Sequence, residues 1–250
     1  MSGWPEGTAR HVFDTLDSTL SEAARMLPTL TGPAWILALE QTAARGRRGR
    51  SWSTPRGNFA STLIMERVGS PADAARRSFV ASLALREALV GLTGLTGLTG
   101  RADAFTLKWP NDVLLNGGKV AGILLETVGA HLVIGIGVNL AHAPRPDQVE
   151  AGAVVPVSVL GETGISVTPE DLLDALAASF ARLEQQYVSQ GFAPIRAAWL
   201  SHAARRGAVI TARTLREETV GVFEDVDGEG NLVLGTPKGR VVITAADVYF

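Results

Sequence analysis

The segment from Arg45 to Arg50 limits the possible folds of this chain more than any other stretch. It reads Arg-Gly-Arg-Arg-Gly-Arg, so six consecutive positions hold four positive charges, two glycines and no acidic residue. Like charges repel one another, and each glycine adds backbone entropy that folding must remove. An apolar run, Trp35 to Leu39, precedes the segment. We therefore expect a mobile basic loop at the end of a buried strand, ordered by a bound anion such as phosphate.

A short arginine-rich stretch is more often a solvated turn, a nucleic-acid patch or a targeting signal than part of an active site. The rest of the chain argues against a general nucleic-acid binder, because 23 basic residues face 25 acidic ones and the pI is near 6.1. Nucleic-acid-binding domains usually have a pI above ~9. The positive charge is confined to one loop, which favours a small anionic ligand over a polymer.

The 250 residues are enough for one well-filled core and a smaller second domain. The chain has no cysteine, which excludes disulfides and thiolate metal sites and is typical of a reducing compartment. Residues 1–6 lack the basic start and apolar core of a signal peptide, and no run reaches ~18 apolar residues. We therefore expect a cytoplasmic protein with no membrane partner.

Hydrophobic periodicity and turn residues predict a chain of mixed helices and strands. We expect helices starting near residue 18 and over 79–90, 168–190 and 193–200, and strands over 35–39, 61–65, 113–115, 120–125 and 131–139. Asn116-Gly117-Gly118 predicts a tight hairpin. Thr19 and Glu22 have the spacing of a capping box, so Thr19 is expected to cap the first helix. The three Gly-Leu-Thr units at 91–100 predict a surface connection, since a glycine every third residue disfavours a helix.

The composition changes near residues 203–207. Four short strand candidates follow, over 209–214, 219–224, 231–234 and 240–244, with turn residues at 227–230 and 236–239. Short, closely spaced strands favour a small barrel. We therefore expect two domains, residues 1–203 and 204–250.

A second dense stretch, residues 107–126, contains Lys108-Trp109-Pro110-Asn111-Asp112 and Gly118-Lys119. With Gln41 to Trp52 before it and Gly135 to Asn139 after it, the chain resembles the biotin protein ligase family, within the wider group of biotin and lipoate ligases, over about residues 10–250. The resemblance implies an α+β fold: a mixed sheet flanked by helices, as in the class II synthetase-like catalytic core, with a small C-terminal SH3-like β-barrel. No region long enough for a helix-turn-helix precedes the match, so the DNA-binding repressor form is not expected.

The resemblance also implies a two-step reaction. The carboxylate of biotin attacks the α-phosphate of ATP, giving biotinyl-adenylate and pyrophosphate, and a lysine of a biotin carboxyl carrier domain of a carboxylase then takes the acyl group. ATP with Mg²⁺ and biotin are the expected small molecules, and the carrier domain is the expected partner. Self-association into a homodimer stays open.

The residues that the resemblance places at the ligand supply positive charge and hydrogen bonds for an acyl-phosphate. Those expected to contact biotin or the adenylate are Ser18, Thr19, Gln41, Arg45, Gly46, Arg47, Arg48, Arg50, Trp52, Asn111, Lys119, Gly122 and Asn139. Arg45, Lys119 and Asp112 are the expected catalytic group, with Asp112 also the candidate Mg²⁺ ligand. From the residues alone, Ser18 and Thr19 equally suit a helix cap, Asn111 and Asp112 an Asx turn, and Lys119 a solvated surface site.

Two departures from the family keep alternatives open. Leu20 stands where the family has asparagine, which is compatible with a less polar acyl group such as lipoate or octanoate. Ala44 stands where the family usually has glycine, and a positive φ there would cost roughly 1 kcal/mol. A protein that binds biotin or an adenylate without transferring it is the alternative outside the enzymes. The four histidines lack metal-site spacing.

Overall fold

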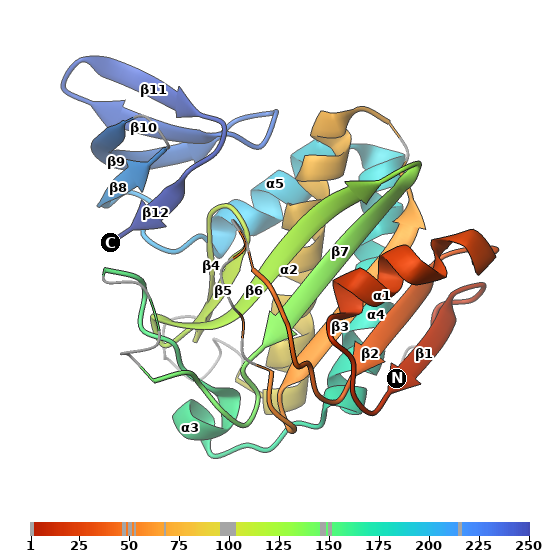
Figure 1. Cartoon of the computed structure of the whole chain (residues 1–250). Helices are drawn as coiled ribbons and strands as arrows, with labels where there is room; N and C mark the ends of the chain where they lie inside the picture. The colour runs from red at the N-terminus through yellow and green to blue at the C-terminus, as the bar shows by residue number, and fades with distance from the viewer. Residues whose placement is uncertain are drawn as a thin grey trace.

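The computed structural model describes residues 3–46, 49, 52, 54–67, 69–95, 104–145, 149, 152–214 and 217–250. A seven-stranded mixed sheet in the order β1-β2-β3-β7-β6-β5-β4 forms the first part of the chain (Figure 1). Its strands are β1 (Ala9–Phe13), β2 (Ala34–Ala38), β3 (Phe59–Glu66), β4 (Phe105–Lys108), β5 (Asp112–Leu115), β6 (Gly118–Val128) and β7 (His131–Val138). β1 and β2 are parallel, and the other neighbouring pairs are antiparallel.

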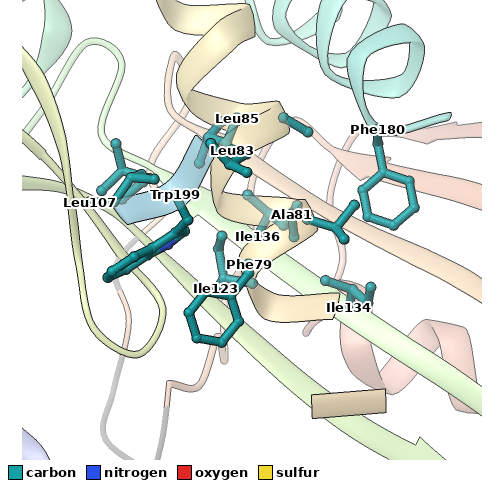
Figure 2. Close-up of a cluster of buried hydrophobic side chains, with 14 of the residues drawn as sticks. Phe79, Ala81, Leu83, Leu85, Leu107, Ile123, Ile134, Ile136, Phe180 and Trp199 are labelled. Carbon is teal, nitrogen blue, oxygen red and sulfur yellow. The ribbon is translucent and has the colours of Figure 1, made fainter. Parts of the chain in front are cut away.

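Helices cover both faces of this sheet. They are α1 (Thr19–Met26), the short 3₁₀ helix η1 (Leu27–Thr29), α2 (Pro71–Thr93), α3 (Val159–Thr163), α4 (Pro169–Gln190) and α5 (Phe192–Ser201). The main core lies between the sheet and α2, α4 and α5, where Phe79, Phe180 and Trp199 pack against the sheet (Figure 2). On the opposite face, Leu20 and Ala23 of α1 pack on strand residues in a smaller cluster. α1 thus covers the part of the second face that carries this cluster.

The first helix begins where the sequence predicts, but its start differs from the expected capping box. Thr19 is the first helical residue and Ser18 is the N-cap, without a side-chain cap hydrogen bond. The hydroxyl of Thr19 donates instead to Oε1 of Gln41 (3.1 Å), and Glu22 pairs with Arg25 (2.7 Å). The capping-box prediction is therefore wrong, because a partner distant in sequence takes the threonine hydroxyl.

The helix α2 runs further than predicted. The first Gly-Leu-Thr unit, residues 91–93, forms its last turn, and Gly94 ends it in a left-handed conformation (φ 66°). The expectation that this unit belongs to a surface connection is therefore wrong, since a helix already built over 71–90 extends through one glycine. Residues 96–100 lie outside the described part of the chain.

Several other elements match the predictions, whereas β1, η1 and α3 were not predicted. Asn116 and Gly117, both with positive φ, form the predicted hairpin between β5 and β6. α4 and α5 occupy the predicted helical regions, with Thr168 capping α4 through the backbone N–H of Asp171. Among the described residues, Asn116 and Arg205 are the non-glycine positions with positive φ, so Ala44 does not carry the strain considered above.

The C-terminal part is a five-stranded antiparallel sheet in the order β11-β10-β9-β8-β12. Its strands are β8 (Val209–Arg213), β9 (Glu218–Val226), β10 (Leu232–Thr236), β11 (Gly239–Ile243) and β12 (Asp247–Tyr249). The four predicted strands are present. β12 was missed by the sequence analysis, and it pairs with β8 alone.

Backbone hydrogen bonds fix the C-terminal sheet beside β4. Leu107 of β4 donates to His202 O (2.8 Å) and accepts from the N–H of Ala204 (2.8 Å), so the connection after α5 runs along this edge strand. The indole N–H of Trp109 donates to Gly230 O in the turn between β9 and β10 (3.0 Å). Within the described ranges, no helix combines the length and the apolar character needed to cross a bilayer.

Candidate active site

A cavity of about 790 Å³ opens on the sheet beside the start of α1. Eleven residues chosen from the sequence line it, namely Ser18, Thr19, Gln41, Arg45, Gly46, Trp52, Asn111, Asp112, Lys119, Gly122 and Asn139. Arg47, Arg48 and Arg50, the other three, lie outside the described residues. Segments separated by more than a hundred residues thus meet at one cavity.

The floor of the cavity is a trough formed by glycines on two paired strands. Gly135, Gly137 and Asn139 alternate along β7 and its end, so they face the same side, and Gly122 of β6 pairs with Gly137. An alanine Cβ at Gly135 would lie 2.9 Å from Leu20 Cγ, and one at Gly137 would lie 2.5 Å from Nε1 of Trp52. These glycines are therefore required for the close approach of the two side chains.

One end of the trough is polar and held by a chain of hydrogen bonds. Oε1 of Gln41 accepts from the backbone N–H of Thr19 (2.7 Å) and from its hydroxyl (3.1 Å). The Gln41 amide donates to the hydroxyl of Thr54 (3.1 Å), and Thr62 donates to the hydroxyl of Thr19 (2.8 Å). Such a network orients its amide and hydroxyl groups and suits recognition of a small polar ring.

The loop before Ser18 is fixed by an ion pair. The side chain of Arg25 donates to both oxygens of Asp17 (2.6 and 3.1 Å), and the backbone N–H of Ser18 donates to Oδ1 (2.7 Å). These hydrogen bonds, first those from Arg25, lower the pKa of the Asp17 carboxyl to about 2. Asp17 is therefore charged at neutral pH and keeps the start of α1 in position.

Two lysines face one carboxylate beside the trough, because Asp112 of β5 pairs with Gly122 of β6. Nζ of Lys119 lies 2.8 Å from Oδ1 of Asp112, and Nζ of Lys108 lies 3.5 Å from Oδ2. Lys108 and Asp112 are direct partners in the β4–β5 register. Lys119 also lies over the ring of Trp52, with Nζ 5.7 Å from the centroid. This group carries one net positive charge, suited to an anion.

The other end of the trough offers an unpaired acceptor. Asn139 is only 1% exposed, and its amide N–H donates to Val157 O (3.1 Å). Its Oδ1 is buried without a hydrogen-bond partner in the part of the chain that the structure describes. A buried acceptor of this kind is costly unless a ligand donates to it. Nearby Asn111 donates its side-chain amide to Ile123 O.

The described start of the basic loop is held by contacts on both sides. Arg45 pairs with Glu126 of β6 (2.9 Å) and donates to the hydroxyl of Ser21 (3.3 Å). The backbone N–H of Trp52 donates to Ala44 O (3.0 Å), which closes the base of the loop. Both members of the Arg45–Glu126 pair are partly exposed, so the pair contributes little stability and an anion can compete for Arg45.

Sixteen further residues line the cavity but were not among the predicted site residues, although Leu20 and Ala44 had been noted as departures from the family. They are Leu20, Ala44, Lys108, Ile123, Leu124, Gly135, Ile136, Gly137, Pro144, Val149, Ala153, Val154, Pro156, Asp247, Val248 and Tyr249. The glycines of β7 carried a signal, because glycine inside a strand indicates close approach of another group. β12 carried none, since three residues are too few for a periodic pattern. Among the described residues, no group of three His, Cys, Asp or Glu side chains could hold a metal ion.

Comparison with known proteins gives consistent matches. The model of the biotin/lipoate A/B protein ligase family matches residues 12–139, and that of the biotin protein ligase C terminal domain matches residues 207–250. The biotin–[acetyl-CoA-carboxylase] ligase of Paracoccus denitrificans is 55% identical over 239 residues, 94% of this chain and 97% of that protein. The bifunctional ligase/repressor BirA of Bacillus subtilis is 29% identical over 94% of this chain and 72% of its own length.

Solved structures show the same fold. The biotin protein ligase from Aquifex aeolicus, in complex with biotin and ATP, superposes with a TM-score of 0.83 at 20% identity, covering 96% of this chain and 98% of that one. The expected α+β class, a mixed sheet flanked by helices with a C-terminal SH3-like domain, is thereby confirmed.

Proposed function

Because the chain belongs to the biotin/lipoate A/B protein ligase family, we propose that it is an ATP-dependent biotin ligase that modifies a lysine of a biotin carboxyl carrier domain. In the first step, a carboxylate oxygen of biotin bonds to the α-phosphorus of ATP while the bond to pyrophosphate breaks. In the second step, the uncharged amine of the carrier lysine attacks the acyl carbon and AMP leaves with the bonding electrons.

The glycine trough is the observation that carries this proposal. Alternate residues Gly135, Gly137 and Asn139 span about 13 Å of strand at ~3.3 Å per residue. Along this distance the trough passes three groups in order: the polar side chains of Thr19 and Gln41, then Lys119, then the unpaired acceptor of Asn139. An acyl-adenylate has the same sequence of parts: a head group, an anionic linkage and a base with an N–H donor.

Each end of the trough suits one part of that ligand. Thr19 and Gln41 provide hydroxyl and amide groups for the ureido ring of biotin, with Ser18 beside them at the N-terminus of α1. Oδ1 of Asn139 can accept from the exocyclic amine of adenine, a position where guanine has a carbonyl oxygen. That difference favours ATP over GTP.

Positive charge is needed where two anions react. Lys119 and Arg45 neutralise charge that develops between the carboxylate and the α-phosphate, and a site closed to water protects the mixed anhydride. Arg47, Arg48 and Arg50 belong to the same basic loop by sequence and are proposed to complete its closure. Asp112 is also the proposed group that accepts a proton from the acceptor lysine.

Mg²⁺ accompanies ATP in such reactions and neutralises phosphate charge when bound. Proteins commonly hold it with one or two carboxylates together with phosphate oxygens and water. Asp112 fits that role as a carboxylate within the cavity, and the phosphates of ATP would provide further oxygens. We assign residues 1–203 to the catalytic domain and 204–250 to the second domain, and we expect the reaction to occur in the cytoplasm.

The test is ATP-dependent labelling of a carrier domain, followed by mass spectrometry with biotin and with lipoate as acyl donors. The proposal predicts labelling with biotin, and trapping of biotinyl-adenylate by hydroxylamine when the carrier is omitted. Leu20, which packs on Gly135, favours the alternative of a less polar acyl group, and labelling with lipoate alone would select it. Tight binding of the adenylate without labelling would identify a non-catalytic binder.

A further inference from the structure

The last residue of the chain reaches the charged wall of the cavity. Phe250 follows β12, whose three residues line the cavity. Nζ of Lys108 lies 5.7 Å from the centroid of the Phe250 ring, and the guanidinium of Arg205 lies 5.5 Å from it. Phe250 is 45% exposed, so these cation–ring contacts are partly accessible to water.

Lys108 also forms an ion pair with Asp112, one of the proposed catalytic residues. Its side chain is 11% exposed and that of Asp112 is 13% exposed, so their charges are largely removed from water. Asp112 faces Lys119 through one oxygen and Lys108 through the other. When Lys119 turns toward the α-phosphate, Lys108 is the protein cation that stays on Asp112, and a largely buried carboxylate that lost both lysines would be strongly destabilised. Lys108 supplies the positive charge that lets Asp112 release Lys119.

We propose that Phe250 is a positioning residue for adenylation, which it assists by holding Lys108 against Asp112. The idea rests on the proposed biotin ligase function and extends it, because it gives the C-terminal domain a direct part in the first chemical step. In that step the carboxylate–phosphorus bond forms, the bond to pyrophosphate breaks and pyrophosphate takes the electron pair. No proton moves, so the contribution of Lys108 and Phe250 is electrostatic.

Backbone hydrogen bonds near β4 and a contact of Tyr249 place Phe250 beside Lys108. The connection at 202–204 is hydrogen-bonded to Leu107, the residue before Lys108, and Arg205 follows it directly. The guanidinium of Arg213 on β8 lies 4.7 Å from the ring centroid of Tyr249, which precedes Phe250. Phe250 is therefore held on the side of β4 that carries Lys108.

The experiment measures the two chemical steps separately in the full-length protein. Single-turnover formation of biotinyl-adenylate from biotin and ATP reports adenylation, and preformed biotinyl-adenylate with carrier domain reports transfer. Phe250→Ala is expected to slow adenylation about two- to fivefold, the size of a partly exposed cation–ring contact, with the KM for biotin and the transfer rate unchanged. Phe250→Tyr should retain the wild-type rate, whereas Phe250→Leu should behave like alanine.

A double mutant tests whether Phe250 acts through Lys108. Lys108→Met should slow adenylation roughly tenfold or more, and adding Phe250→Ala should slow it no further. Val242→Ala, at an exposed position of β11 in the same sheet, is the control and should leave both steps unchanged. Thermal unfolding of each variant verifies that the fold is retained.

The outcomes separate the two levels of the proposal. If the wild-type protein forms no adenylate, the proposed function itself is wrong. If the wild-type protein forms it and Phe250→Ala does so equally fast, only the role of Phe250 is overturned. Multiplying effects in the double mutant, or a wild-type rate for Phe250→Leu, would also overturn it.

Discussion

Replacing Gly137 by alanine tests whether the glycine trough fixes Trp52 at the reacting end of the ligand. The added Cβ would lie 2.5 Å from Nε1 and 2.8 Å from Cε2 of the indole. Ordinary van der Waals contact starts at 3.4 Å, so the indole must retreat by about 0.9 Å. Trp52 cannot keep its present position above the trough in this variant.

The structure indicates which segment moves to relieve this clash, and general packing energies give its cost. Inserting one methyl group into a packed site costs about 1–3 kcal/mol. β7 is paired on both sides, by β3 and β6, whereas Trp52 is a half-buried residue of a loop. The loop should therefore move rather than the strand. We expect the affinity for a non-hydrolysable biotinyl-adenylate analogue to fall about 5- to 150-fold, with little change in the free energy of unfolding.

Calorimetric titration with the analogue measures the affinity, and thermal unfolding followed by circular dichroism measures the stability. Trp52→Phe provides the matched background, because its smaller ring leaves room for the methyl group. Gly137→Ala should then cost less affinity in that background than in the wild-type protein. An unchanged affinity for Gly137→Ala, or a loss of stability with affinity retained, would refute the role given to the trough.

Three further predictions follow from single contacts. Lys119→Ala should reduce the kcat/KM of adenylation by an amount equivalent to roughly 1.5–3 kcal/mol, the value of a charge-assisted contact, and unchanged labelling kinetics would remove Lys119 from the site. Trp109→Phe leaves Gly230 O without its donor and should lower the free energy of unfolding by about 1 kcal/mol, measured by urea denaturation. At the start of α2, hydrogen bonds from the side chain and backbone of Ser70, and from Tyr187, lower the pKa of Asp73 to about 2. Its stabilising contribution should therefore be complete above about pH 4 and be lost as the pH falls from 3.8 toward 2, so Asp73→Asn should flatten this part of the stability–pH curve.

The sequence predicted the elements that are specified by residues close together in the chain. The Asn116-Gly117 turn needs positive φ at both positions, so its composition specifies the hairpin. Thr168 and Pro169 mark the start of α4, and Gly191 follows its end. The prediction that Gly91-Leu92-Thr93 belongs to a surface connection was wrong, because a long helix tolerates one glycine near its end.

Long-range contacts account for what the sequence could not predict. Thr19 has the spacing of a capping residue, yet its hydroxyl bonds to Gln41, 22 positions away. Glycine inside a strand, as at Gly135 and Gly137, is typical of close approach by another group, but nothing in the sequence identifies Leu20 and Trp52 as the side chains that approach. β12 is short, and its place at the cavity depends on pairing with β8. The family resemblance, rather than periodicity, selected Lys119 and Asn139, and their roles stay predictions.

A crystal structure with a non-hydrolysable biotinyl-adenylate analogue tests the central claim most directly. The account predicts the ureido ring beside Thr19 and Gln41, the linkage within reach of Lys119, and the adenine amine donating to Oδ1 of Asn139. It also predicts the loop from Arg45 to Arg50 closed over the ligand. An analogue bound elsewhere, or a loop turned into solvent with Gln41 and Lys119 bordering no ligand, would contradict it.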